Sequence, residues 1–315
     1  SAIAVTHNDL VNDSEFGVGV LGGYSGPGQL DATCNWWGSV SGPSGPANPT
    51  GTGSAALGTT NIHMWLTGSI GGAPLCNGTF PVKNLSTGFT YPTIQAAIDA
   101  PATLDGHTIL APANTYVENV HVTKGVTLQG ANAGACAANG GARGAESVID
   151  GNTVDAAVVI LVDNVTLDGF KIIHGVNGSY NAGVWMSAAA KNLTIKNNIV
   201  TDNTIGIYAN CSDASLIDCN LIAANNLPGP AGGSGIYSEN TVKLTVQKNE
   251  FTGHTGNNPV IFGATAAGVH QNLQFKNNNV HDTYGVYTLS ITTGTFSGNT
   301  ITTAHTVSNP DGVTG

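Results

Sequence analysis

Short runs of alternating apolar and polar residues recur along most of the chain, and an asparagine and a second apolar pair follow each run. The pattern reads LTIKNNIV ending at Val200, SLIDCNLI ending at Ile222 and LTVQKNEF ending at Phe251. Alternation with a period of two residues predicts β-strands, and no repeat contains an apolar pattern of helix length. The aligned asparagines form two series with spacings of 21 to 29 residues: Asn8 and Asn35, then Asn198, Asn220, Asn249, Asn278 and Asn299.

A second motif, glycine followed by valine or isoleucine and often by an aromatic residue, precedes most of these runs. It begins at Gly183, Gly206, Gly235 and Gly285, with a variant at Gly268. A unit of roughly 20 to 30 residues cannot bury its own apolar face, so the units must stack and pair their strands in parallel. The asparagines then lie above one another as a hydrogen-bonded ladder. The pattern predicts an all-β fold, a parallel β-helix solenoid of about ten coils.

One segment departs from this pattern. The sequence YPTIQAAIDA, residues 91–100, predicts a short helix that begins near Thr93 and ends before Pro101. We expect this helix to cap the N-terminal end of the solenoid, where it would cover exposed strand edges. The alternation also assigns inward-facing positions, which are Val165, Leu167, Leu193, Ile195, Ile217, Val246, Phe275 and Phe296.

The helix and the strand-like sequence that follows it, as far as Gly130, resemble the opening of right-handed parallel β-helix domains of the pectin-lyase-like superfamily. The stretches RGAESVIDG around Arg143 and CNWWGS around Trp36 are similar to parts of large bacterial secreted or cell-surface proteins with such domains. The resemblance covers nearly the whole chain and is specific for the fold. It implies little about activity, because this superfamily includes lyases, hydrolases, adhesins and inert scaffolds.

The order of these segments is unusual. In the surface proteins that the chain resembles, the NWWG segment usually closes a solenoid, whereas here it precedes the expected capping helix. When the C-terminal sequence is placed directly before the N-terminal sequence, the two ends of the chain read as one coil. In this coil Asn299 and Asn8 lie 24 residues apart. Residues 1–37 are therefore expected to complete a β-helix end, either of their own chain or of a neighbour. The residues assigned to this junction are Ser1, Ile3, Val5, Asn8, Trp36, Trp37, Gly312 and Val313.

The chain is expected to consist of three segments. After the terminal coils, residues 38–83 are rich in glycine, proline, serine and threonine and are expected to be a linker. Residues 84–315 hold the capping helix and the main β-helix.

Charge and composition exclude several partners. The net charge is −10 and the one arginine is Arg143, so no cluster of cations could neutralise nucleic-acid phosphates or a polyanionic sugar. The longest apolar run, residues 156–162, is too short to span a bilayer. Few charges with many threonines and asparagines favour an extracellular or cell-surface location without membrane insertion. Sequons for N-glycosylation, for example at Asn77, Asn84 and Asn192, matter if the source organism glycosylates its secreted proteins.

The five cysteines contain no CxxC pair, which disfavours a zinc ribbon. Cys211 and Cys219 lie eight residues apart, and Cys76 and Cys136 lie in loops near the expected helix. We predict these two pairs as disulfides, with Cys34 left as a free thiol.

No catalytic constellation, cofactor motif or metal motif is recognisable. The resemblance implies a basic residue beside calcium-binding carboxylates in lyases, or paired aspartates in hydrolases, and neither pattern is present. Arg143 and Glu146 are interpreted as part of a surface loop. An outward column is predicted to be a surface ion-pair ladder rather than a base between two carboxylates, because such a base would have a raised pKa. Its members are Asp168, Lys196, Asp218, Gln247 and Lys276.

The third residues of the glycine motifs, which follow the valine or isoleucine, form a second outward column. Its members are Trp185, Tyr208, Tyr237, His270 and Tyr287. Such a row could stack on sugar rings or be covered by a neighbouring segment or subunit. The function predicted from the sequence is a structural or adhesive extracellular module that associates head-to-tail into a filament by donation of its N-terminal segment. The alternative is a polysaccharide-binding module or a polysaccharide lyase or hydrolase, with a carbohydrate as partner.

Overall fold

A computed structural model describes residues 5–6, 8–12, 15–20, 30–46, 48–58, 60–62, 65–66, 68–72, 76–77, 82–176, 180–263, 269–282 and 284–303. The chain divides into an N-terminal unit, Ser1–Thr103, and a C-terminal unit, Leu104–Gly315. The predicted junction residues Ser1, Ile3, Gly312 and Val313 lie outside the described residues.

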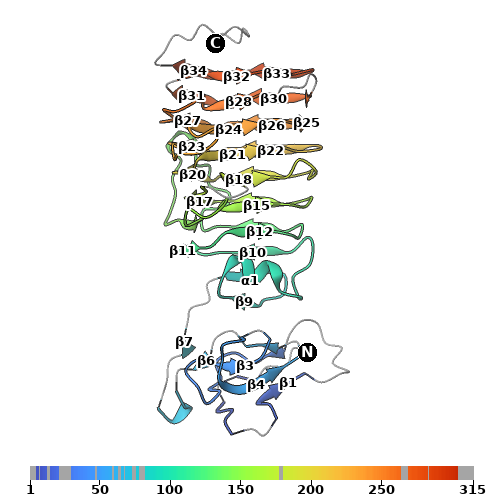
Figure 1. Ribbon diagram of the computed structural model, residues 1–315, viewed down its shortest axis with the longest axis vertical. Coiled ribbons are helices and arrows are strands. Elements are labelled where there is room, and N and C mark those ends of the chain that lie inside the picture. The colour runs from blue at the N-terminus through green and yellow to red at the C-terminus, as the bar shows by residue number, and fades with distance from the viewer. Residues whose placement is uncertain are drawn as a thin grey trace. The chain divides into compact units, whose positions relative to one another are not determined.

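The C-terminal unit is a stack of short strands in three parallel sheets (Figure 1). The first sheet runs in the order β10 (Thr108–Leu110), β13 (Thr127–Gln129), β16 (Thr166–Asp168), β19 (Thr194–Lys196), β22 (Ser215–Asp218), β26 (Leu244–Gln247), β30 (Leu273–Lys276) and β33 (Gly294–Ser297). The second runs β11 (Asn114–Val117), β14 (Ser147–Asp150), β17 (Phe170–Ile173), β20 (Ile199–Thr201), β23 (Leu221–Ala223), β27 (Glu250–Thr252), β31 (Asn279–Asp282) and β34 (Thr300–Thr303). The third runs β12 (Val120–Val122), β15 (Val158–Ile160), β18 (Ala182–Met186), β21 (Ile205–Ala209), β24 (Ser234–Ser238), β28 (Val260–Phe262) and β32 (Val286–Thr288). A short pair, β25 (Thr241–Val242) with β29 (His270–Gln271), and the 3-10 turn Ala138–Gly140 complete this unit.

Each of seven successive coils contributes one strand to each sheet, which is the arrangement of a parallel β-helix, and β33 and β34 follow as the last described strands. The predicted inward-facing residues from Val165 to Phe275 are buried, most of them completely. Phe296 is the exception and is half-buried, because β33 is the last strand of the first sheet and Phe296 packs on Phe275 from one side. The first and second sheets each hold eight strands of this unit in the described residues. The prediction of about ten coils therefore stays a prediction.

An asparagine ladder runs along the corner between the first and second sheets. The backbone N and Nδ2 of Asn198 both donate to Oδ1 of Asn220, at 2.9 and 3.1 Å, and Nδ2 of Asn220 donates to the carbonyl of Ile195 at 2.9 Å. The same three bonds repeat in the next coils as far as Asn299. The predicted ladder is therefore confirmed, and it satisfies buried amide groups that would otherwise lack partners.

The N-terminal unit also contains short strands, some paired in parallel and some antiparallel. These are β1 (Val18–Gly19), β2 (Leu30–Asp31), β3 (Pro43–Ser44), β4 (Gly53–Leu57), β5 (Thr60–Asn61), β6 (Trp65–Leu66), β7 (Cys76–Asn77), β8 (Val82–Asn84) and β9 (Thr90–Tyr91), with the 3-10 turn Ile70–Gly72. Strand β4 pairs in parallel with β1 and β3, and β5 pairs in parallel with β2. Several strands therefore form within residues 38–83, which the composition assigned to a linker. Glycine permits this packing, because a Cβ on Gly53 would lie 2.4 Å from the carbonyl oxygen of Trp37.

The helix predicted from residues 93–100 is present as α1 (Ile94–Asp99). Oγ1 of Thr93 accepts a hydrogen bond from the backbone N of Ala96 at 3.0 Å, as expected of an N-cap. Ile94 and Ile98 are buried, and the helix contacts β8 and β9 in the same unit. Its role as a cap for the solenoid stays a prediction.

The predicted disulfides are wrong. Cys136 is bonded to Cys219 with a Cα–Cα distance of 5.1 Å, and Cys211 is a buried free thiol. Cys211 and Cys219 cannot meet because the extended strand β22 lies between them. Cys34, predicted to be free, is disulfide-bonded, and the side chain of Cys76 lies outside the described residues.

Candidate functional site

An aromatic column runs along the outer face of the third sheet. Trp185, Tyr208 and Tyr237 occupy equivalent positions on β18, β21 and β24, and all three are half-buried. The rings of Trp185 and Tyr208 are stacked with centroids 6.1 Å apart, and those of Tyr208 and Tyr237 are 5.6 Å apart. Tyr180 extends the column with its centroid 4.5 Å from that of Trp185. The parallel register places one ring per coil, which produces a continuous, partly exposed aromatic surface.

His270 was predicted to belong to this column, and that prediction is wrong. Ile261 of β28 pairs with Tyr237 and with Tyr287, and therefore occupies the column position. His270 lies on β29 and is fully buried, with Nδ1 3.0 Å from Oγ1 of Thr241. Burial lowers the pKa of His270 to about 4. The sequence GVH is similar to the glycine motif, but the strand register shows that β28, which precedes it, supplies the residue of the column in this coil.

A carboxylate fixes two of the aromatic side chains. The hydroxyl groups of Tyr208 and Tyr237 donate to Oε2 and Oε1 of Glu239, at 2.8 and 3.3 Å. Burial, followed by the hydrogen bond and charge of Glu239, raises the pKa of Tyr208 to about 12, and the pKa of Tyr237 is raised by burial and Glu239 as well. Both phenols are therefore neutral donors at ordinary pH, which suits a rigid binding face better than a proton-transfer site.

The predicted charge column on the first sheet has the expected register. Asp168, Lys196 and Asp218 occupy successive positions, followed by Gln247 and Lys276. Nζ of Lys196 lies 3.4 Å from Oδ2 of Asp168. Oδ1 of Asp168 also accepts from Nδ2 of Asn197 at 2.7 Å and from the backbone N of Gly134 at 2.9 Å. Both oxygens of Asp168 are therefore engaged by neighbouring groups, which favours the ion-pair interpretation over a catalytic site.

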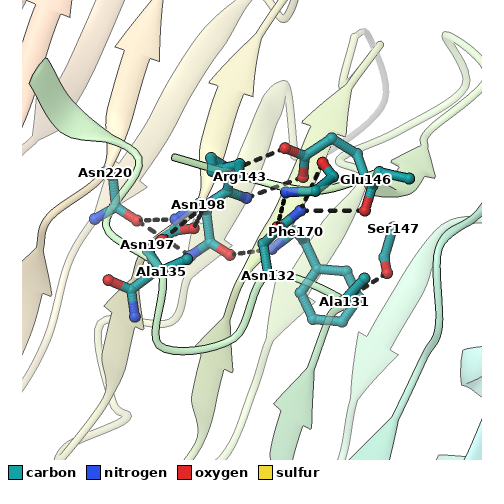
Figure 2. A network of polar contacts seen from close by, with 12 residues as sticks. Ala131, Asn132, Ala135, Arg143, Glu146, Ser147, Phe170, Asn197, Asn198 and Asn220 are labelled. Atoms are coloured by element: carbon teal, nitrogen blue, oxygen red, sulfur yellow. Dashed lines mark hydrogen bonds and ion pairs between the residues drawn. The ribbon is translucent and has the colours of Figure 1, made fainter. Parts of the chain in front are cut away.

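Arg143 has a larger structural role than a surface loop would give it. Figure 2 shows its guanidinium group between Glu146, Ala135 and Asn197, and the side chain is only 7% exposed. Its Nε and Nη2 donate to the two Glu146 oxygens at 2.8 and 2.9 Å, and Nη1 donates to the carbonyls of Ala135 and Asn197 at 2.8 and 2.6 Å. Residues 131–146, which we call the strap, also contact later coils. Cys136 is disulfide-bonded to Cys219, and the backbone N of Asn139 donates to Oε2 of Glu250.

The sequence reasoning missed a second buried ladder, at the corner between the second and third sheets. Asn203 donates from N and Nδ2 to Oδ1 of Asn225, at 3.3 and 2.9 Å. The next members are His254, whose Nε2 lies 3.3 Å from Nδ2 of Asn225, and Asp282, whose Oδ2 lies 2.6 Å from Nδ1 of His254. Because an amide nitrogen only donates, Nε2 of His254 must accept and Nδ1 must carry the proton. The near-regular spacing of these residues could have predicted the ladder. It was missed because the residue type changes along the ladder from asparagine to histidine and aspartate.

The predicted junction residues that the structure describes lie together in the N-terminal unit. The backbone N and Nδ2 of Asn8 donate to Oδ1 of Asn35 at 2.8 and 3.1 Å, and Nδ2 of Asn35 donates to the carbonyl of Val5 at 2.6 Å. These are the same three bonds as in the main ladder, with the carbonyl again three residues before the first asparagine. Trp36 forms a parallel bridge with Asp9, and Trp37 is fully buried. The N-terminal unit thus contains ladder-bearing coils of its own.

These features define a repetitive parallel β-helix. The family model for the right-handed beta helix region matches residues 111–273, just over half of the chain, and the chain belongs to this family. A cell surface glycoprotein of Methanothermus fervidus is 36% identical over 125 residues, which cover 39% of this chain and 19% of that protein. The chain therefore matches about a fifth of that relative's length. No solved structure matches the chain.

Within the described ranges, no group of three or more histidine, cysteine, aspartate or glutamate side chains is placed to hold a metal ion. None of the helices in that same part of the chain has the length and apolar character needed to cross a membrane.

Proposed function

We propose that the chain is a surface-associated structural module, with the capacity to act in adhesion, that assembles head-to-tail into a filament. In this proposal the N-terminal segment, residues 1–37, of one copy completes the solenoid of the next copy. The family match and the name of the M. fervidus relative support the surface-associated role. A head-to-tail contact joins two different surfaces and does not close on itself, so it generates a fibre.

One observation carries the assembly proposal, namely the matching ends of the two asparagine ladders. At one end, Nδ2 of Asn299 donates to the carbonyl of Phe275, and no described residue accepts from its backbone N. At the other end, Oδ1 of Asn8 receives no donor from the described residues, while Asn8 donates to Asn35. In every internal step, Oδ1 of the next asparagine accepts from both nitrogens of the previous one. Asn8 of a second copy supplies the acceptor that Asn299 requires.

The last coil also offers an apolar surface for this contact. Phe296 is half-buried and Leu289 is 39% exposed, whereas the equivalent phenylalanine one coil earlier, Phe275, is fully buried. Strands β32, β33 and β34 each end their sheet in the described residues. An open solenoid end that exposes apolar groups and unpaired strand edges favours association with another coil.

The experiment compares assembly of the full chain with that of two variants by sedimentation velocity and electron microscopy. We expect the full chain to form elongated particles that lengthen with concentration, and deletion of residues 1–37 to abolish them. Asn8→Ala should weaken assembly while leaving the fold intact, because Asn8 is exposed. Glu15→Ala, exposed in the same unit, is the matched control and should assemble normally. A full chain that stays monomeric at high concentration, or a truncated chain that still polymerises, contradicts the proposal.

The aromatic column supports a second candidate function, a polysaccharide-binding face. Rings stacked at one per coil, with phenols fixed by Glu239, present a flat surface on which sugar rings can stack. Trp185 lies within the column, so quenching of its fluorescence on addition of neutral polysaccharide would support this function. An unchanged spectrum at saturating sugar concentration would contradict it.

A further inference from the structure

Four N-x-Ser/Thr tripeptides lie wholly within the described residues, and the structure separates them into two classes. They begin at Asn84, Asn164, Asn192 and Asn210. The tripeptide is the acceptor motif for N-glycosylation, in which the asparagine amide must reach a glycosyl donor. Exposure of the amide therefore decides which of the four can be modified in the folded chain.

Two of the four asparagines are inaccessible. Asn84 is fully buried, its Nδ2 donates to Oγ1 of Thr103 at 2.8 Å, and its Oδ1 accepts from the backbone N of Ser86 at 3.0 Å. Asn210 is 6% exposed, and its Oδ1 accepts from the backbone N of Glu239 and of Asn240 at 3.0 and 3.1 Å. A glycan on either amide would require these buried contacts to break.

Asn164 and Asn192 are exposed and lie at the same corner of successive coils, where the chain turns from the third sheet into the first. Their φ angles are 61° and 56°, so both hold the left-handed turn conformation that asparagine tolerates better than most residues. Nδ2 of Asn192 donates to Oδ1 of Asn164 at 2.6 Å. This bond fixes the Asn164 amide by its oxygen, and Nδ2 of Asn164 has no hydrogen-bond partner among the described residues. Of the two, Asn164 presents the free nitrogen.

A hollow lies beside this asparagine. Its volume is about 510 Å³, and Asn164 lines it together with Asp105, Thr123, Leu161 and Asp163. This volume lies within the range of roughly 300–1,000 Å³ that small-molecule sites occupy. The two carboxylates can accept hydrogen bonds from sugar hydroxyls, and Leu161, 40% exposed, offers an apolar surface for a sugar ring. The first sugar of a glycan attached to Asn164 can rest here without displacing a core side chain.

We infer that Asn164 is an N-glycosylation site of the folded chain, with the donor a polyprenyl-pyrophosphate-linked oligosaccharide. In the transfer, Nδ2 of Asn164 forms a bond to the anomeric carbon of the first sugar. The bond between that carbon and the pyrophosphate oxygen breaks, the polyprenyl pyrophosphate leaves with the electron pair, and the amide loses one proton. This inference does not depend on the proposed head-to-tail assembly.

The experiment uses the purified, folded and unglycosylated chain, incubated with an oligosaccharyltransferase and the lipid-linked donor, followed by peptide mass spectrometry. A flexible Asn-Gly-Thr tail added to the same chain shows that enzyme and donor are active. The matched variants are Thr166→Val and Thr194→Val. Each removes the sequon hydroxyl at the first residue of its strand, β16 or β19, and retains the asparagine and a β-branched side chain.

The added mass is expected on the peptide that contains Asn164. It should disappear in Thr166→Val and persist in Thr194→Val, which keeps the bond from Asn192 to Asn164. Thr166→Ser, which retains the hydroxyl, should restore it. A modified tail with an unmodified Asn164, or glycan on Asn84 or Asn210 of the folded chain, would overturn the inference.

Discussion

At the scale of single residues, two adjacent positions at the corner between the first and second sheets have different roles: one makes the turn and the other joins the ladder. Asn197, with a φ angle of 57°, adopts the left-handed turn, and Asn198 is buried in the ladder. The next coil uses Cys219, with a φ angle of 58°, before Asn220. The turn position therefore tolerates several residue types, whereas the ladder position requires an amide that both donates and accepts. This difference explains why the asparagine spacing was recognisable in the sequence although the preceding residue varies.

His270 should make the stability of the chain depend on pH. Its pKa is lowered from 6.5 to about 4 by burial, so the unfolded chain binds more protons between these values. The contribution of His270 to stability is present above about pH 6.5 and is lost as the pH falls toward about 4. Between pH 7 and pH 5 the loss is on the order of 2 kcal/mol. Urea unfolding at both pH values measures it, and His270→Gln should show a smaller difference. An equal difference in the variant would contradict the assignment.

At the scale of elements, the sequence predicted the strands and the helix that a local pattern encodes, and missed contacts that depend on how the chain passes between coils. The strands around Leu193, Ile217 and Val246 and the helix α1 follow from local alternation and capping, and all are present. The Cys136–Cys219 disulfide and the buried guanidinium group of Arg143 depend on the path of the strap across other coils. No local pattern encodes that path, because its contacts join residues up to 140 positions apart. The same limit applies to His270, whose place depends on an irregular coil.

The strap should contribute measurably to the stability of the C-terminal unit. The Cys136–Cys219 bond closes a loop of 83 residues, and a bond of this kind typically contributes about 2–5 kcal/mol by restricting the unfolded chain. The double variant Cys136→Ser, Cys219→Ser should lower the free energy of unfolding in urea by an amount in this range. Circular dichroism in the absence of urea checks that the fold persists. An unfolding free energy equal to that of the parent would show that the remaining contacts of the strap are sufficient.

At the scale of the whole molecule, the same ladder geometry occurs in both units of the chain. The C-terminal unit carries it as far as Asn299, and the N-terminal unit carries it from Asn8 to Asn35. In a stacked repeat each coil contacts only its neighbours, so the final coil lacks the packing that every internal coil has. The interior coils therefore explain the stability of the solenoid, and the end coils are where a partner can add to it.

Two phenylalanines in adjacent coils test this distinction. Phe275 is fully buried between neighbouring coils, and Phe296 packs on it with ring centroids 5.6 Å apart but is half-buried. Phe275→Ala should lower the free energy of unfolding by about 3–5 kcal/mol in dilute protein, because it leaves a cavity in a closed core. Phe296→Ala should lower it by less, because less surface is removed from water there. If head-to-tail contact covers the last coil, Phe296→Ala should weaken self-association in sedimentation experiments at concentrations where the parent assembles. A variant that assembles as well as the parent would show that Phe296 is not part of the contact.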